Sequence, residues 1–269
     1  MHAHGTPHHW LHPMFWMRWI RKRWRGELPK RASVRLPWGD ILEVGLDSAL
    51  GKSLWQEGAH DLALAEAFSR LVVRGSVVIQ VAADVGYVGA VNGRALGSRG
   101  RLHVFQMDPE LQEDLTNNLE RLRSAGTFPE YKIYGGLPGS GSDAPALGDL
   151  IGMDSVNVMG LQAGGSELSL LESAEQALAE HRIEHVIFHD GGGRCGPFLK
   201  QYGYELFRLC WSQDGLELAD YEDESRRLPG EAPRFVATVR PRLLISRCSQ
   251  GGWKVLGQRL RDRDLVPLE

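Results

Sequence analysis

The sequence predicts an α/β fold with a mostly parallel β-sheet and helices on both of its faces. Short, β-branched apolar runs alternate along the chain with longer segments in which apolar residues recur every three or four positions. This alternation predicts parallel strands, because each pair of parallel strands needs a crossover connection. The 269 residues, of which 42% are hydrophobic and 24% charged, are sufficient for one full core.

The first strand–helix unit follows a predicted helix over residues 61–71, which is rich in good helix formers and ends before Gly75. Residues 76–83, SVVIQVAA, form a nearly continuous apolar run, which is typical of a strand buried on both faces. Gly86 follows at the turn, and residues 88–96 continue as a helix.

The second unit begins with a strand over residues 102–107, and Asp108-Pro109 is a start signal for the next helix. Two further strands are expected at residues 155–161 and 185–188. Between them, apolar residues at positions 168, 171, 174 and 178 predict one amphipathic helix that Ser166 opens.

Ligands in such sheets bind beyond the carboxyl ends of the strands, which points to the two turns at residues 80–86 and 106–108. Ala82 and Ala83 are small enough for the backbone to approach a ligand closely. At the end of the second strand, Gln106 or Asp108 could accept hydrogen bonds from ribose hydroxyls. Close packing of the turns without a ligand is the alternative interpretation.

Four segments resemble the FkbM-type methyltransferases in order and spacing over about residues 34–210: LPWG at 36–39, LWQEG at 54–58, VVIQVAADVGYVGA at 77–90 and LHVFQMDPELQEDLTNNLERL at 102–122. The resemblance implies a Rossmann-like class I methyltransferase fold, S-adenosylmethionine as the cofactor, and O-methylation of a sugar or another small metabolite. The family's first motif, Asp-x-Gly-Ala-Asn-x-Gly-Tyr, falls on residues 80–87. With the second turn, it implies eight cofactor-binding residues: Gln80, Ala82, Ala83, Asp84, Gly86, Tyr87, Gln106 and Asp108.

Several positions depart from the family pattern. An amide, Gln106, replaces the acidic residue after the second strand, and Asn157 and Met159 replace the lysine and aspartate of a later motif. A hydroxyl acceptor benefits from a nearby base, and the candidate catalytic residues are Glu167, His189 and Asp190, with Asp84 as a further carboxylate. For His189, a satisfied histidine at a strand end is the alternative. The departures also favour a second function, that of a catalytically degenerate methyltransferase-fold protein acting as a binding or partner subunit.

Residues 1–32 form a basic aromatic arm that holds five of the ten histidines and four of the eight tryptophans. The stretch 18–31 carries about +6, which leaves about -9 for the rest of a chain whose net charge is -3. We expect the arm to pack on its own body or to stay disordered, and contact with an anionic membrane surface is the alternative. The charge predicts no specific nucleic-acid partner, and we expect a cytoplasmic protein, with a membrane-peripheral location if the arm binds lipid.

The sequence divides into the arm at 1–32, a cap segment and helix at 33–75, the methyltransferase domain at 76–250, and a solvated tail at 251–269. The three cysteines lack the paired spacing of a structural zinc site, and we expect no metal. If the protein is a methyltransferase, its expected partner is a small-molecule acceptor. If it is a catalytically degenerate subunit, a protein partner is expected instead.

Overall fold

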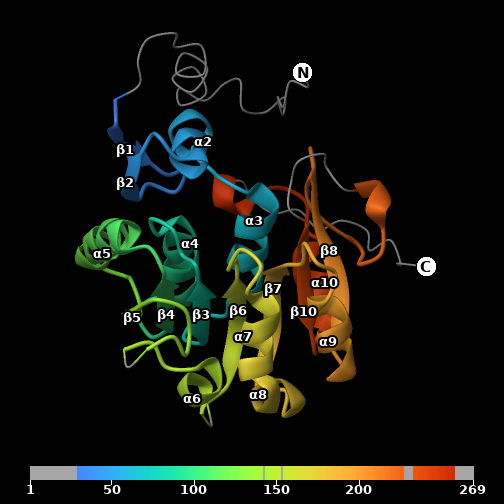
Figure 1. Cartoon of the computed structure of the whole chain (residues 1–269). Helices are drawn as coiled ribbons and strands as arrows, with labels where there is room; N and C mark the ends of the chain where they lie inside the picture. The colour runs from blue at the N-terminus through green and yellow to red at the C-terminus, as the bar shows by residue number, and fades with distance from the viewer. Residues whose placement is uncertain (1–28, 142, 153, 227–232, 258–269) are drawn as a thin grey trace.

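In the computed structural model, an eight-stranded sheet runs through the part of the chain that the structure describes, residues 29–141, 143–152, 154–226 and 233–257 (Figure 1). Its strand order is β5-β4-β3-β6-β7-β10-β8-β9. The strands are β3 (Val77–Val81), β4 (Arg101–Gln106), β5 (Glu130–Gly135), β6 (Val156–Leu161), β7 (Ile183–His189), β8 (Glu205–Ser212), β9 (Gly215–Asp220) and β10 (Arg234–Thr238).

The chain starts this sheet at β3, moves outward through β4 to β5, and returns to place β6 on the other side of β3. β3 to β7 are parallel, whereas β10 lies antiparallel between β7 and β8. This order confirms the predicted Rossmann-like class I methyltransferase fold. The reversal between β4 and β6 on either side of β3 is the switch point where open α/β sheets bind ligands.

Helices cover both faces of the sheet, and each face has its own cluster of buried apolar side chains. One face carries α3 (Leu62–Leu71), α4 (Tyr87–Leu96), α5 (Pro109–Ser124) and α10 (Pro241–Cys248). The other carries α6 (Leu147–Ile151), α7 (Glu167–Ser173), α8 (Glu175–Ala179) and α9 (Cys195–Gln201). Neighbouring residues of β3 enter opposite clusters, Val78 the first and Ile79 the second, which explains why this strand reads as a continuous apolar run.

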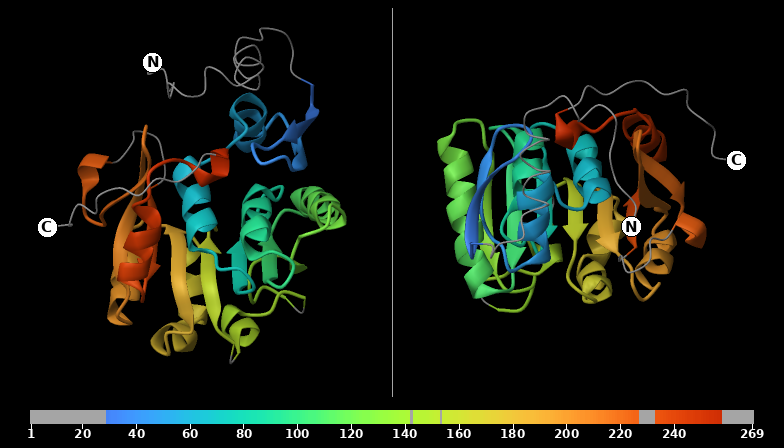
Figure 2. Two further views of the ribbon diagram at one scale, coloured as in Figure 1. Left: turned by 180° about the vertical axis from the view of Figure 1, so that it is seen from behind. Right: turned by 90° about the horizontal axis from the view of Figure 1, so that it is seen from above.

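A small cap precedes the sheet in sequence and lies over one of its ends (Figure 2). It consists of an antiparallel hairpin of β1 (Arg31–Arg35) and β2 (Ile41–Gly45), followed by α2 (Ala49–Glu57). α2 packs so closely on the hairpin that a Cβ at Gly51 would lie 1.8 Å from the backbone oxygen of Gly45. Glycine is therefore required at position 51.

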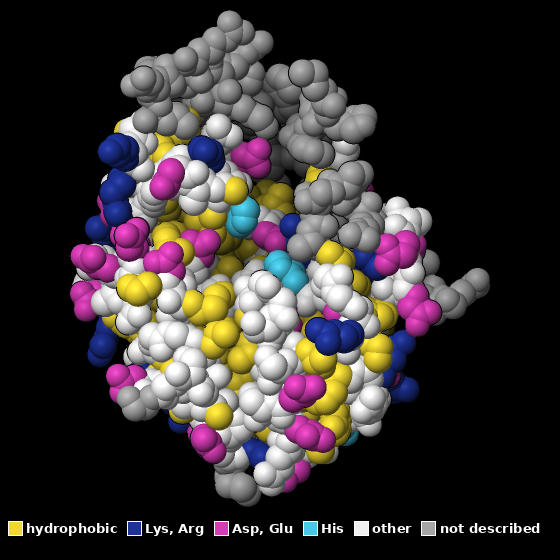
Figure 3. All heavy atoms as spheres, viewed as in Figure 1, with side chains coloured by type: hydrophobic (Ala, Val, Ile, Leu, Met, Phe, Trp, Pro, Cys, Tyr) yellow, Lys and Arg dark blue, Asp and Glu magenta, His cyan; other side chains and the backbone are white. Residues whose placement is uncertain are grey.

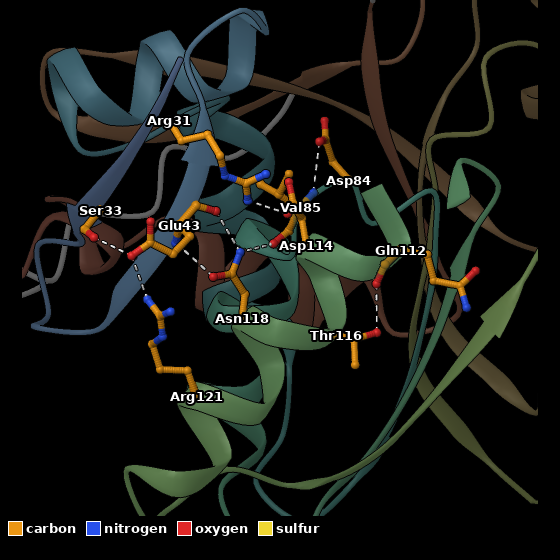
Figure 4. Close-up of polar contacts among 10 residues, drawn as sticks. All are labelled: Arg31, Ser33, Glu43, Asp84, Val85, Gln112, Asp114, Thr116, Asn118 and Arg121. Carbon is orange, nitrogen blue, oxygen red and sulfur yellow. Dashed lines mark hydrogen bonds and ion pairs between the residues drawn. The ribbon is translucent and has the colours of Figure 1, made fainter. Parts of the chain in front are cut away.

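The side chain of Asn118 on α5 ties this cap to the sheet domain (Figure 4). Its Oδ1 accepts from the backbone N–H of Glu43 at 2.8 Å, and its Nδ2 donates to the backbone oxygens of Glu43 and Val85, each at 2.9 Å. The Arg121 guanidinium adds an ion pair to the Glu43 carboxylate at 3.0 Å. One buried amide thus fixes β2 of the cap, α5 and the turn after β3 relative to one another.

Three sequence expectations need correction. The helix expected after Ser166 is two short helices, because the backbone at Ala174 (φ -108°, ψ 12°) leaves the helical region. β1 begins at Arg31, inside the segment assigned to the arm. The prediction that the tail is solvated is wrong for residues 251–257. There, Trp253 and Val255 are each only 2% exposed, and Lys254–Leu256 forms a 3₁₀ helix. Residues 1–28 and 258–269 lie outside the described part of the chain.

Candidate functional site

A cavity of about 350 Å³ lies between the cap and the carboxyl ends of β3, β4, β6 and β7. Figure 3 shows the face of the molecule below the cap, where apolar and histidine side chains surround a hollow. The lining residues are Leu50, His60, Asp61, Leu64, Ala82, Ala83, Asp84, Tyr87, Val88, Gln106, Met107, Asp108, Leu111, Gln162 and His189. The volume falls at the small end of the range for organic ligands, roughly 300–1,000 Å³, so the cavity suits one compact ligand.

The turn after β3 forms one wall through Ala82, Ala83 and Asp84. Ala82 (φ 57°) and Asp84 (φ 51°) both adopt the left-handed conformation, which residues other than glycine rarely occupy. Such strain persists where the surrounding structure demands it, and it concentrates at binding sites. Tyr87 at the start of α4 adds a buried ring to the same wall. The structure therefore brings together four of the residues predicted to bind the cofactor.

Replacing Ala82 with glycine should raise the free energy of unfolding by up to about 1 kcal/mol. The left-handed conformation costs an alanine about 1–2 kcal/mol, and glycine avoids this cost. Glycine also has more conformational freedom in the unfolded chain, which cancels part of the stabilisation. Urea denaturation of the two proteins measures the difference. Ala83, whose φ is not positive, is the matched control, since Ala83→Gly should destabilise the fold. A destabilised Ala82→Gly variant would mean that this turn is not left-handed.

The turn after β4 contributes the opposite wall. Gln106 is buried, its Nε2 donates to the backbone oxygen of Asp84 at 3.0 Å, and its Oε1 accepts from the backbone N–H of Asp108 at 3.2 Å. The Asp108 carboxylate accepts from the backbone N–H of Glu110 at 2.9 Å and so caps α5. Gln106 thus joins the two turns, and both predicted ribose acceptors, Gln106 and Asp108, line the cavity.

The cavity is electrostatically one-sided. Three carboxylates line it, those of Asp84 and Asp108 and that of Asp61, which is paired with Arg234, whereas none of the described lining residues is a lysine or an arginine. Desolvation raises the pKa of Asp84, and the nearby negative charge of Asp108 adds to the effect. Such a lining favours a cationic or neutral ligand and repels an anionic one.

The end of the cavity beside β6 and β7 is lined by Gln162 and His189. Burial lowers the pKa of His189, so its imidazole is neutral near pH 7, and its Nε2 is buried without a hydrogen-bond partner among the described residues. Sequence reasoning missed Gln162, although it directly follows β6 and the rule that ligands bind at carboxyl ends of strands could have found it. Its Oε1 accepts from Gln80 Nε2 at 2.9 Å.

Two of the predicted cofactor-binding residues lie behind the wall rather than on it. Gln80 is fully buried in β3 and touches the cavity only through Gln162, and its own Oε1 has no described hydrogen-bond partner. Gly86 starts α4 with φ 96°, and a Cβ there would meet the Leu115 side chain at 3.0 Å. Both positions shape the turn from behind.

Of Glu167, His189 and Asp190, only His189 lines the cavity, together with Asp84, the further candidate carboxylate. Glu167 is buried and accepts from the backbone N–H of Gly165 at 2.7 Å, and its charge raises the pKa of His189. Asp190 accepts from the backbone N–H groups of Arg194 and Gly196, both at 2.9 Å, and from the Tyr221 hydroxyl at 3.0 Å. These three bonds place Asp190 at the start of α9, outside the cavity lining.

Within the described ranges, no group of three or more His, Cys, Asp or Glu side chains could hold a metal ion. No described helix is long and apolar enough to cross a bilayer.

No protein-family model matches the sequence, and no curated protein matches it either. Among solved structures, the chain is similar to precorrin-6y C5,15-methyltransferase from Geobacter metallireducens (12% identity, 66% of this chain and 91% of that chain, TM-score 0.44). It is also similar to a TehB-like SAM-dependent methyltransferase from Corynebacterium glutamicum (16% identity, 70% of this chain and 92% of that chain, TM-score 0.40). A third likeness is to a putative rRNA-methylase from Clostridium thermocellum (14% identity, 66% of this chain and 97% of that chain, TM-score 0.43). Likenesses this distant say nothing about activity.

Proposed function

We propose that the protein is an S-adenosylmethionine-dependent methyltransferase that methylates a hydroxyl group of a sugar or another small metabolite. The observation that carries the proposal is the cavity at the switch point of the sheet, lined by carboxylates and apolar side chains. The resemblance of residues 34–210 to the FkbM-type methyltransferases supports it independently. A catalytically degenerate binding subunit remains the second candidate, favoured by the amides at positions 80 and 106.

The charge of the cavity distinguishes this cofactor from the dinucleotides that related sheets bind. A pyrophosphate needs backbone N–H groups or cationic side chains at a helix start. Here, Asp84 lies beside that helix start and Asp108 faces it from the next turn, so two carboxylates would repel the phosphates. A sulfonium is cationic and is attracted by the same carboxylates. The lining therefore fits an adenosyl sulfonium better than a dinucleotide.

The residues present offer a place for each part of this cofactor. Gln106 and Asp108 would accept hydrogen bonds from the ribose hydroxyls, and Ala82 would let the backbone approach the nucleoside. Met107 would pack against the adenine ring, since its side chain lines the cavity and is 42% exposed, which is unusual for a large apolar residue. When bound, the cofactor supplies an activated methyl group.

The acceptor would occupy the end beside β6 and β7. There, His189 is neutral and its Nε2 is unpartnered among the described residues, so it can accept a proton. His189 would accept the proton of the acceptor hydroxyl when that oxygen takes the methyl group. Gln162 can orient a second polar group of the acceptor. Since the described lining offers no lysine or arginine, an uncharged acceptor fits better than a phosphorylated or carboxylated one.

Calorimetry with S-adenosylmethionine tests the cofactor assignment. We expect one binding site, and a dissociation constant about fivefold higher in the Met107→Ala variant, because about 1 kcal/mol of apolar contact is lost. Val73, the other large apolar residue with an exposed side chain among the described residues, lies outside the cavity lining and provides the control. Val73→Ala should leave the dissociation constant unchanged. Absence of binding at millimolar ligand would overturn the proposal, and equal effects of the two variants would place the ligand elsewhere.

Transfer of a labelled methyl group to a set of sugars tests the acceptor class. Neutral sugars should be methylated, whereas their phosphates and uronic acids should react slowly or not at all. Binding of the cofactor without transfer to any acceptor would favour the degenerate binding subunit.

A further inference from the structure

The start of α3 is linked to the sheet by a long-range ion pair at the cavity wall. Asp61 is the N-cap residue of α3, and its Oδ1 accepts from the backbone N–H of Leu64 at 3.3 Å. Its Oδ2 accepts from Nε of Arg234, the first residue of β10, although 173 positions separate the two in the sequence. Asp61 has the left-handed backbone conformation (φ 43°) and lines the cavity. A strained, ion-paired carboxylate therefore faces the ligand space.

His189 is a direct neighbour of this ion pair. In the antiparallel pairing of β7 and β10, Arg234 lies opposite His189. Residues opposite one another in antiparallel strands point to the same face, with Cβ atoms about 4.5–5.5 Å apart. The imidazole of His189 therefore shares one side of the sheet with the Arg234 guanidinium, and the latter is held by Asp61. His189 and Asp61 both reach the cavity.

We propose that Asp61 is a positioning residue for the methyl transfer. Its ion pair with Arg234 holds the start of α3 against the ends of β7 and β10, and so fixes His189 at the acceptor end of the cavity. The positive charge of Arg234 also balances the negative charge of Asp61, so the acceptor end of the cavity is polar but carries no net charge from this pair. This inference rests on the proposed function for its catalytic part, whereas the arrangement of the three side chains can be tested without it.

Charged groups on three elements face the His189 imidazole, and they act in opposite directions. Burial lowers the pKa of His189 most strongly. Asp61 at the start of α3 and Glu167 on α7 raise that pKa, whereas Arg234 on β10 lowers it. Removing either partner of the ion pair should thus shift the titration of His189, and the two shifts should have opposite signs.

Titration of His189 by NMR tests the arrangement in the full chain. The His189→Gln variant identifies its signal among the ten histidines. Asp61→Asn should lower the pKa of His189, Arg234→Gln should raise it, and the double variant should lie near the wild type. Asparagine is a good N-cap residue and tolerates the left-handed conformation, so Asp61→Asn preserves the start of α3. Asp47→Asn, which removes an exposed carboxylate of the cap, is the control and should shift nothing.

Kinetics test the positioning role. At pH 8, where His189 is neutral in the wild type and in Asp61→Asn, this variant should lower kcat/KM by about 10- to 100-fold, the cost of misplacing a reacting group by up to about 1 Å. Wild-type kcat/KM in this variant would overturn the proposal. Shifts of the same sign in both single variants would also overturn it, since partial unfolding moves every histidine toward its ordinary pKa. A wild-type protein that binds no S-adenosylmethionine would reject the proposed function alone, because the titration does not depend on the cofactor.

Discussion

Replacing Glu66 with glutamine should lower the free energy of unfolding by about 3–5 kcal/mol, the cost of leaving a buried charge without its partner. Glu66 in α3 is completely buried, Arg70 one turn later is 5% exposed, and Glu66 Oε1 accepts from Arg70 Nε at 2.6 Å. Glutamine keeps the size of the side chain, so no cavity forms. The loss is therefore electrostatic, and denaturation in urea measures it.

The pair matters because it orders the segment that follows α10. Glu66 accepts from the backbone N–H groups of Lys254 and Val255 at 2.8 and 2.9 Å. Arg70 donates to the backbone oxygens of Cys248, Gln250 and Gly252 at 2.7–2.8 Å. Two side chains thus add to the little regular structure of this segment, which consists of one β-bridge between Gly252 and Gly215 and the short 3₁₀ helix Lys254–Leu256. In Glu66→Gln, amide exchange of residues 250–257 should accelerate more than that of β3.

The pair of Arg182 and Glu180, at 2.7 Å, is the matched comparison because the Glu180 side chain is 44% exposed. Glu180→Gln should lower the free energy of unfolding far less than Glu66→Gln, as is usual for ion pairs at the surface. If Glu66→Gln cost as little, the buried pair would not be what holds the segment after α10.

Local signals in the sequence were sufficient for the strand–helix units around the cavity. β3 is apolar at four of its five positions because both faces are buried, and the start of α5 carries Asp108 as its cap and Pro109 as its first residue. Strands at the margins give weaker signals. β1, with the sequence RASVR, alternates polar and apolar residues over only five positions and buries only Val34. Such strands are formed by their neighbours rather than by their own composition.

The candidate site divides in the same way. Ala82, Gln106 and His189 could be predicted to meet, because each follows or ends a parallel strand and the carboxyl ends of such strands share one edge. The contact of Asp61 with Arg234 could not, since it joins residues 173 positions apart and depends on how β10 inserts beside β7. The same holds for Asp190, whose bond to the Tyr221 hydroxyl has no local signal.

The second large effect is expected on catalysis. His189→Gln should lower kcat by about 10²–10⁴-fold, the usual contribution of a positioned base, whereas the dissociation constant for S-adenosylmethionine should change little. Under the proposed function, the wild-type protein should lose activity only at acidic pH. Because burial lowers the pKa of His189, the imidazole stays neutral to a pH below about 6.5, the ordinary pKa of histidine, and the fall in kcat/KM should lie below that value.

His60 is the matched control, since it lines the same cavity from the cap. A base that accepts the proton affects kcat, whereas a residue that only contacts the ligands affects KM, so His60→Gln should raise KM and leave kcat nearly unchanged. His189→Gln should also abolish the acidic fall in kcat/KM, because no group remains there to be protonated. Should that fall persist unchanged in His189→Gln, or should both variants lose kcat equally, the proton must pass to another group.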